Sequence, residues 1–231
     1  VVRDPRWGRT GETFGEDPML VSEFGKTFTK ALQNNPDPSK RVAACAKHYI
    51  AGSQPYNGLN FAPENTSERE LREIFLPPFE ACVAAGLMTV MAAHHSLNGI
   101  PCHANEYILQ DILKEELGFE GFVVSDWSDI QRLHTIHKVA ESPEAASVLG
   151  FNSGVDMHMH GPGFFDHILQ AYNEGLVSEE RINDAARRIL KVKFELGLFE
   201  NAIVDLAKIN EHMHTEENKA AALEAAKKTI M

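Results

Sequence analysis

Short apolar runs alternate with longer amphipathic stretches along most of the chain. The runs are too short for helices and rich in β-branched residues, so they predict buried strands at residues 42–46, 89–93, 122–124 and, more briefly, 155–157. Elsewhere apolar positions recur at helical spacing, which predicts helices near residues 18–34, 68–85, 106–117, 144–149, 164–174 and 178–196. Strands that alternate with helices indicate a parallel sheet with crossover helices.

Residues typical of helix ends support this division. Ser67 and Glu70 have the spacing of a capping box ahead of an apolar periodic run. Gly86 and Gly118 stand where a glycine commonly terminates a helix. The helices near residues 68–85 and 106–117 are therefore expected to end close to these glycines.

Polar residues follow every apolar run at its C-terminal end. In (β/α) barrels, the active-site residues lie at the C-terminal ends of several successive strands. We therefore expect one end of the sheet to gather Lys47, His48, His94, Asp126 and either Asp156 or His158. The chain contains neither G-x-G-x-x-G nor G-x-x-x-x-G-K-[ST], which a doubly wound nucleotide-binding sheet would be expected to carry.

The number of strands and the pattern after residue 196 predict the domain organisation. Only about four of the eight strands of a closed barrel are visible, so the fold class is a partial (β/α)8 TIM barrel, incomplete at its N-terminus. We assign residues 1–198 to this catalytic barrel. Residues 199–231 contain a loop and a polar helix at 216–228, and we interpret them as a linker and the truncated start of a following domain.

Composition and charge narrow the possible partners. The 231 residues are 43% hydrophobic and 24% charged, as in a globular domain, and the formal net charge is −11. An acidic surface argues against nucleic acid and anionic membranes as partners, and it suits a neutral ligand. No apolar run approaches the roughly 18–20 residues that span a bilayer. Three scattered cysteines do not make a disulfide framework.

Asp126 is the strongest candidate for chemistry. It follows a strand and lies beside Trp127, whose flat apolar face can stack on a sugar ring. Glycoside hydrolysis needs two carboxyls, and Asp126 suits the nucleophile or base. The alternative is a structural role, in which Asp126 caps a helix near residues 129–139.

Two other segments are rich in hydrogen-bond donors. Lys47 and His48 can donate to sugar hydroxyls, or they form an ordinary loop pair. The opening residues 3–9 contain three arginines, including Arg9, whose planar forks suit hydroxyl pairs or carboxylates. Alternatively, these arginines pair with the nearby Glu12 and with other acidic residues of the same loop.

His158 and His160 raise the alternative of a metal-dependent barrel hydrolase. The H-x-H spacing can bind zinc, with a third ligand such as His94 or Asp126 from another strand. Because the run has no acidic or cysteine partner close by and continues into Gly-Pro-Gly, we expect no metal at these histidines.

Together these segments resemble glycoside hydrolase family 3, which includes many β-glucosidases. The resemblance covers nearly the whole chain and is carried by RDPRWGR and E-x-F-G-E-D-P within residues 3–18, AACAKHY at 43–49, SERELRE at 67–73, M-x-x-x-x-S-x-N-G-x-P at 91–101, GFEGFVVSDW at 118–127, GVDMHM at 154–159 and GLVSEERINDAARRILKVKFELGLFE at 175–200. Several motifs in the same order are far more specific than any one of them.

The resemblance implies roles for individual residues. Asp126 is the nucleophile, and Arg9, Lys47 and His48 bind hydroxyls of the sugar that is attacked. Met91 lines this pocket, and Trp127 helps to form the neighbouring aglycone subsite. His94 stands where many members carry a tyrosine that touches the nucleophile; a histidine titrates near pH 6.5, and a neighbouring carboxylate moves this upward.

The resemblance also implies what this chain does not contain. The first barrel strands and an aspartate that grips the sugar are expected before Val1. The acid/base glutamate is expected in a second domain of the same protein, because Lys47 begins KHYIAG and not the K-H-F-P-G-H-G of members that use a histidine. The acid/base residue therefore remains unassigned.

The expected function is that of a retaining, exo-acting β-glycosidase acting on an oligosaccharide or β-glycoside, with β-glucosides as the first expectation and xylosides next. The mechanism implied by the resemblance is a covalent glycosyl-enzyme on Asp126, which needs neither a metal nor an organic cofactor. Besides the metal hydrolase, an inactive truncated glycan-binding domain remains an alternative. The isolated chain is expected to lack part of the catalytic machinery.

Overall fold

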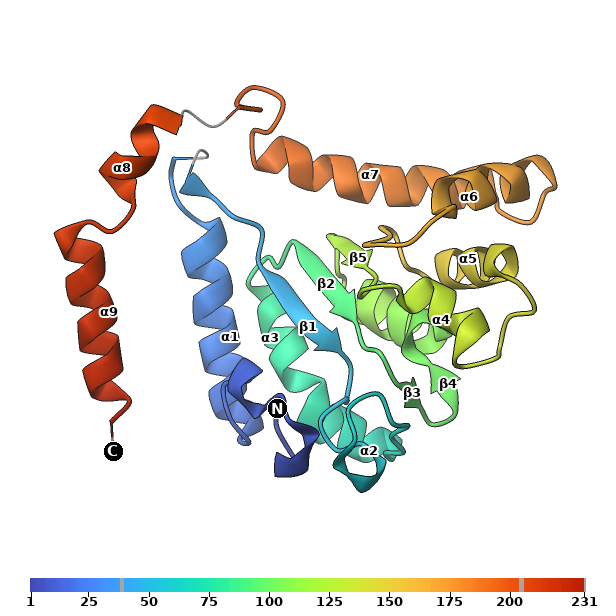
Figure 1. Cartoon of the computed structure of the whole chain (residues 1–231), viewed down its shortest axis with the longest axis horizontal. Coiled ribbons are helices and arrows are strands. Elements are labelled where there is room, and N and C mark those ends of the chain that lie inside the picture. The colour runs from blue at the N-terminus through green and yellow to red at the C-terminus, as the bar shows by residue number, and fades with distance from the viewer. Residues whose placement is uncertain (38–39, 204–205, 231) are drawn as a thin grey trace. The chain divides into compact units, whose positions relative to one another are not determined.

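A parallel sheet organises the N-terminal part of the molecule. The computed structural model describes residues 1–37, 40–203 and 206–230. Its strands β1 (Cys45–Tyr49), β2 (Thr89–Ala92) and β5 (Phe122–Val124) lie side by side in the order β1-β2-β5 and run in the same direction (Figure 1). Met157 adds a parallel bridge to Val124. Four successive strand positions therefore follow chain order, as expected for a barrel wall.

The first strand starts later than its apolar run predicts. Val42 is 57% exposed, its N–H donates to the carbonyl of Leu32, and the N–H of Ala44 donates to Gln33 Oε1. Residues 42–44 are thus bound to the end of the preceding helix, and the strand begins only at Cys45. Lys47 and His48 consequently lie within β1 and do not follow it. The Lys47–His48 and Tyr49–Ile50 peptide bonds are cis.

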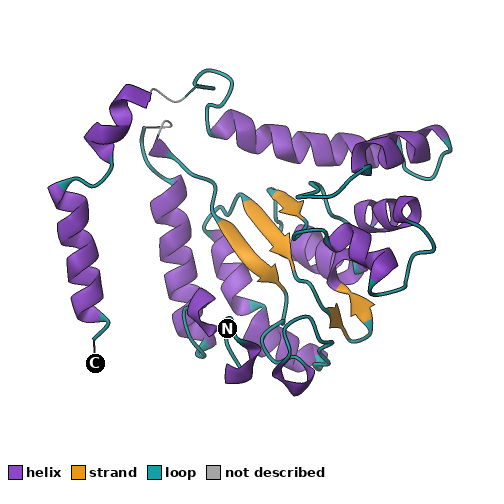
Figure 2. Ribbon diagram, in the orientation of Figure 1, coloured by secondary structure: helices purple, strands orange, loops and turns teal. Residues whose placement is uncertain are grey.

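Helices follow the strands and cover the sheet (Figure 2). The long ones are α1 (Pro18–Gln33), α3 (Pro77–Ala84), the π-helix Tyr107–Glu116, α4 (Asp129–Thr135), α5 (Pro143–Asn152), α6 (Phe164–Asn173) and α7 (Glu179–Glu195). The predicted helix at 68–85 is divided into α2 (Glu68–Glu70), a π-turn (Leu71–Phe75) and α3, because Pro77 and Pro78 have no N–H to donate within a continuous helix. Ser67 caps α2 as predicted, accepting from the N–H of Glu70.

Short elements complete the loops around the strand ends. They are the 3-10 turns Pro5–Trp7, Thr10–Glu12, Tyr56–Gly58 and Cys102–Ala104, and the antiparallel pair β3 (Ser96–Leu97) and β4 (Ile100–Pro101). Gly86 and Gly118, which end helices, adopt positive φ angles as expected for that position.

Alternation along the strands determines which side chains are buried. Val90, Ala92 and Val123 are fully buried in one core with apolar residues of the covering helices, such as Ile112 and Leu113. Successive strand residues point to opposite faces, so Met91 lies on the other face and is half-buried. The dry, packed side of the sheet holds the strand ends in fixed positions.

Asp156 belongs to the core and not to the expected polar cluster at the strand ends. Its Oδ1 accepts from Lys114 Nζ and from Arg181 Nη2, each at 2.8 Å, and its Oδ2 accepts from the Val123 N–H at 2.8 Å. The side chain of Asp156 is completely buried. The expectation that Asp156 faces the site is therefore wrong, because its carboxylate ties β5, the π-helix and α7 together.

Internal contacts divide the chain into two compact units, Val1–Leu196 and Gly197–Met231. The second unit contains α8 (Ile209–His212) and α9 (Glu216–Lys228), and α9 has the bounds expected from the sequence. That residues after 198 form a linker and the start of another domain stays a prediction. Among the described residues, no helix has the length and apolar character needed to cross a bilayer.

Candidate active site

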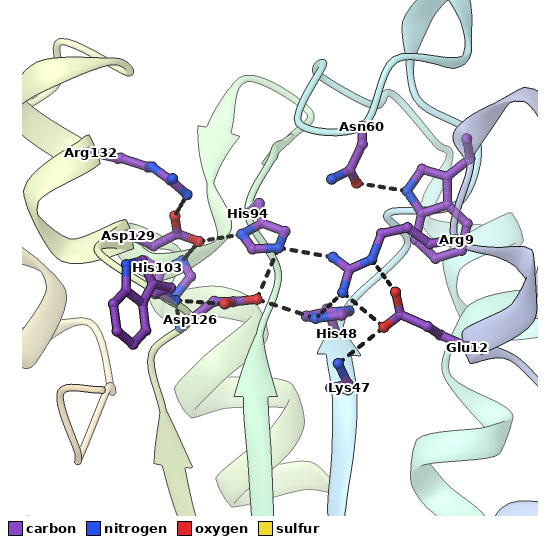
Figure 3. A network of polar contacts seen from close by, with 12 residues as sticks. Arg9, Glu12, Lys47, His48, Asn60, His94, His103, Asp126, Asp129 and Arg132 are labelled. Atoms are coloured by element: carbon purple, nitrogen blue, oxygen red, sulfur yellow. Dashed lines mark hydrogen bonds and ion pairs between the residues drawn. The ribbon is translucent and has the colours of Figure 1, made fainter. Parts of the chain in front are cut away.

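The carboxylate of Asp126 lies at the centre of a polar cluster above the C-terminal ends of β1, β2 and β5 (Figure 3). Asp126 is only 9% exposed. Its Oδ2 lies 2.9 Å from His94 Nε2 and 3.2 Å from His48 Nε2, and its Oδ1 accepts from the Trp127 N–H at 2.5 Å. Residues from three neighbouring strand ends thus converge on one carboxylate.

The same contacts argue against the structural alternative for Asp126. Ser128 occupies the N-cap position of α4. The Asp126 carboxylate does not cap that helix, because its oxygens bond the Trp127 N–H and the two imidazoles. Asp126 N–H itself donates to His103 Nε2 at 3.0 Å, which fixes the backbone of the strand end.

Arg9 approaches the carboxylate from the N-terminal segment. Its guanidinium nitrogens lie 3.1 Å from His94 Nε2 and 3.2 Å from His48 Nε2. Glu12 binds the Arg9 fork with both oxygens, at 2.7 and 2.8 Å, and one of these oxygens also accepts from Lys47 Nζ at 3.1 Å. The predicted pairing of Arg9 with Glu12 is therefore present, and this ion pair places two cationic side chains beside the cluster.

A chain of polar contacts continues behind His94. Its Nδ1 lies 2.8 Å from Asp129 Oδ2, and Asp129 Oδ1 accepts from Arg132 Nη1 at 2.6 Å. His103 Nδ1 is 3.8 Å from the same Asp129 Oδ2. Figure 3 shows this chain running from Asp126 through His94 to the first turn of α4.

The electrostatic surroundings determine which groups carry charge. Burial would raise the pKa of Asp126, but hydrogen bonds from the two imidazoles and the Trp127 amide lower it far below its ordinary value. Burial disfavours the charged form of His94, yet its hydrogen bonds to the two carboxylates outweigh this and raise its pKa. Burial lowers the pKa of His48 despite the opposing effect of Asp126. Asp126 is therefore an ionised carboxylate at neutral pH.

Two further predicted residues lie at the edge of this arrangement. Trp127 is 55% exposed, and its ring stacks on His160 with centroids 3.8 Å apart and an interplanar angle of 11°. Met91 lies in β2 opposite Val124, on the half-open face of the sheet. Trp127 thus presents a flat aromatic surface next to Asp126.

The His158–His160 alternative finds no third ligand among the described residues. The His158 ring stacks on Phe164, while the His160 ring stacks on Trp127. Among the described residues, one group of side chains is close enough together to hold a metal ion. It consists of His48, His94 and Asp126, whose ligand atoms lie within 4.8 Å of one another. Arg9 already occupies the space beside both imidazole nitrogens, so a cation there would have to displace a guanidinium.

The sequence reasoning missed His103, Asp129, Arg132 and Asn60, which accepts from Trp7 Nε1 at 2.9 Å. A local signal existed for Asp129 alone, because it lies three residues after Asp126 in the same Ser-Asp-Trp-Ser-Asp segment. The polar position of His103 in its loop carries no such signal. Only the folded chain brings these groups together.

Comparisons with known proteins agree with this architecture. Residues 1–192 match the model of the glycosyl hydrolase family 3 N terminal domain. A β-xylosidase from Formosa agariphila is 40% identical over 243 residues, which cover 99% of this chain and 33% of that protein. A periplasmic β-glucosidase from Salmonella typhimurium is 37% identical over 200 residues, covering 86% of this chain and 26% of that protein.

Solved structures show the same fold. A β-glucosidase from Erythrobacter marinus superposes with a TM-score of 0.91 at 38% identity, over 95% of this chain and 30% of that one. A β-glucosidase from Listeria innocua in complex with glucose has a TM-score of 0.89 at 34% identity, over 95% and 31% respectively. The chain spans about a third or less of the length of these relatives.

These findings confirm the partial TIM barrel predicted from the strand and helix pattern. The match extends from Val1 almost to the end of α7 and includes every strand of the parallel sheet. A family model that covers so much of the chain, together with relatives of up to 40% identity, leads to one assignment. The chain belongs to glycosyl hydrolase family 3 and forms part of its N-terminal, TIM-barrel-like domain.

Proposed function

We propose that the full-length protein is a retaining, exo-acting β-glycosidase in which Asp126 is the nucleophile. The observation that carries the proposal is the ionised Asp126 carboxylate, held at the end of β5 by donors from neighbouring strands. A carboxylate nucleophile must be charged and fixed in position, and its strongly lowered pKa keeps it charged. Family membership makes glycoside hydrolysis the reaction to assign to it.

The remaining cluster residues suit a sugar bound against Asp126. Arg9, Lys47 and His48 offer N–H donors on one side of the carboxylate, and sugar hydroxyls can accept from all of them. Trp127 offers an exposed aromatic face on which the leaving part of the substrate can stack. We assign Met91 to the wall of the same pocket and His94 to a hydrogen bond with the nucleophile.

In the proposed mechanism, one oxygen of Asp126 attacks the anomeric carbon while an acid protonates the departing glycosidic oxygen. The bond to the leaving group breaks, and a glycosyl ester forms on Asp126. Water then attacks the same carbon and releases the sugar with retained configuration. Glu12 is unsuited to be the acid, because the hydrogen bond from Arg9 lowers its pKa to about 2. The proposal assigns the acid to none of the described residues.

The substrate class follows from the relatives. Solved structures of the Listeria innocua β-glucosidase contain glucose, gluconolactone or isofagomine, so we propose β-glucosides as the first substrates. The β-xylosidase relatives make β-xylosides the second. Comparing kcat/KM for 4-nitrophenyl β-glucoside and β-xyloside on the full-length protein ranks the two.

Trapping the covalent intermediate tests the mechanism. A 2-deoxy-2-fluoro-β-glycoside with an activated leaving group should inactivate the full-length protein. The fluorine slows both formation and hydrolysis of the ester, and the activated leaving group restores the rate of formation alone, so the ester accumulates. Mass spectrometry of proteolytic peptides should then find one sugar on the peptide that contains Asp126. Labelling of another carboxylate, or first release of the α-anomer from a β-glycoside by NMR, would refute the proposal.

The pH profile tests the proposed role of His94. Its raised pKa places an ionisation above the ordinary value of about 6.5, whereas a tyrosine stays neutral until about pH 10. Wild-type kcat/KM should therefore carry an extra ionisation above the ordinary histidine value, and His94→Tyr should remove it. Normalised profiles that superimpose would show that His94 does not touch the nucleophile during the reaction.

A further inference from the structure

Asp129 is a buried carboxylate to which neither the sequence motifs nor the proposed mechanism gives a role. It is 1% exposed, lies in the first turn of α4 and faces the ring nitrogen of His94 that does not contact Asp126 (Figure 3). Its Oδ2 is 2.8 Å from His94 Nδ1, and its Oδ1 accepts from Arg132 at 2.6 Å. The Phe61 ring packs on the His94 imidazole at a centroid distance of 4.3 Å and confines the ring from a third side.

The geometry determines where the protons of His94 lie. A carboxylate can only accept, so His94 Nδ1, 2.8 Å from Asp129, must carry a hydrogen. His94 Nε2 lies 2.9 Å from Asp126 Oδ2, which is again an acceptor. Arg9 Nη1, a donor, lies 3.1 Å from the same Nε2, but the contact with Asp126 is shorter and is made to a negative charge, so we place a second hydrogen on Nε2, facing Asp126. His94 is thus an imidazolium between two carboxylates.

We infer that Asp129 is a positioning residue that holds His94 doubly protonated and neutralises its charge, so that Asp126 receives a hydrogen bond from a neutral ion pair. This inference rests on the proposed function, in which Asp126 must remain a strong nucleophile. An isolated cation beside Asp126 would reduce its basicity and its reactivity. The His94–Asp129 pair donates a hydrogen bond as a tyrosine hydroxyl does, and it adds no net charge.

The other charged and titratable groups around His94 disfavour a positive charge on its ring. The guanidinium of Arg9 lies 3.1 Å from Nε2, and its positive charge disfavours a positive His94 ring. Neighbouring imidazoles have the same effect whenever they are protonated; they belong to His48, His95, His103 and His137. Arg132 also opposes the positive ring, because it shares the charge of Asp129. Among the residues that the structure describes, the carboxylates of Asp126 and Asp129 are the two groups that favour the imidazolium through direct contact.

Titration of His94 by NMR tests this inference without any substrate. In full-length protein with 13C-labelled histidine rings, the His94 signal is assigned by its loss in His94→Tyr. Asp129→Asn should lower its titration midpoint by about 1–3 pH units, the effect of removing one adjacent opposite charge. Arg132→Met should raise the midpoint, because Asp129 then interacts with His94 alone. Asp184→Asn, which removes an arginine-bound carboxylate on α7, should leave it unchanged.

Kinetics supply a second readout. Asp129→Asn should reduce kcat more than it changes KM and should alter the pH profile, and in a His94→Tyr background it should cause little further change. An unchanged or raised His94 midpoint in Asp129→Asn would overturn the inference even if Asp126 is labelled by the fluoroglycoside. Failure of that labelling would instead refute the proposed function. If Asp129→Asn does not fold, a His94 midpoint that fails to rise in Arg132→Met decides against the inference.

Discussion

Asp126→Asn should lower kcat for an aryl β-glucoside by at least about a thousandfold in the full-length protein, since losing a nucleophile removes the covalent pathway itself. A thousandfold loss corresponds to about 4 kcal/mol of transition-state stabilisation. Asparagine keeps the shape of the side chain but is neutral, so it cannot form the glycosyl ester. Its oxygen can still accept from His48 and His94, while its NH2 takes the place of the oxygen that accepted from the Trp127 N–H, so one hydrogen bond is lost and the fold should be retained.

The control is Asp111→Asn, which removes one negative charge at an exposed position of the π-helix Tyr107–Glu116. It should leave kcat within about a factor of two, because surface substitutions have small effects. Circular dichroism should show the same folded state for both variants. An Asp126→Asn variant that keeps more than about a tenth of wild-type turnover would contradict the assignment of the nucleophile.

The second large effect concerns stability. Lys114→Met should destabilise the barrel unit by about 1.5–3 kcal/mol, because the buried Asp156 carboxylate loses one of its two cations together with a charged hydrogen bond. Lys114 Nζ donates to Asp156 and to the carbonyl of Gly154, at 2.8 and 2.9 Å. Burial lowers the pKa of Lys114 to about 8, against the opposing effect of Asp156, so the ammonium is charged at pH 7. Methionine fills a similar volume but leaves Asp156 with Arg181 as its cation.

Lys191→Met is the matched control for this prediction. Lys191 pairs with Glu120 on the surface, where both side chains are exposed, and such pairs contribute about 0–1 kcal/mol. The two variants should be compared by denaturant unfolding of the full-length protein, with limited proteolysis reporting on the barrel unit. Similar losses for the two would show that the Asp156 cluster is not a main support of the fold.

Periodicity along the chain predicted the fold because it reports local geometry. Apolar positions at helical spacing located α1, α6 and α7 closely, the polar stretch at 216–228 located α9, and three strands followed from their apolar runs. The boundary of β1 was misplaced because Ala44 satisfies its N–H with Gln33, a partner eleven residues away. The break between α2 and α3 coincides with Pro77, whose effect is local, but its π-turn was not anticipated.

The motifs also predicted most of the cluster at the strand ends. Arg9, Lys47, His48, His94 and Asp126 do converge in the structure, although their roles in catalysis stay proposals. Asp156 was misplaced because consecutive residues at a strand end point to opposite faces, and the sequence alone does not say which face is which. His158 was offered as the other choice, but its ring packs against Phe164.

The sequence by itself determined that this chain has a β/α pattern of family 3 type, with Asp126 and His94 after strands, Lys47 and His48 near the end of another, and Arg9 in the opening segment. Only the tertiary structure decided that Asp129 backs His94, that His103 accepts from the Asp126 N–H and that Asp156 joins Lys114 and Arg181 in the core. The physical reason is that periodicity and motifs encode neighbours along the chain. Hydrogen bonds between buried polar groups are instead chosen by which loops meet after the core has packed, across 23 to 42 positions in these examples.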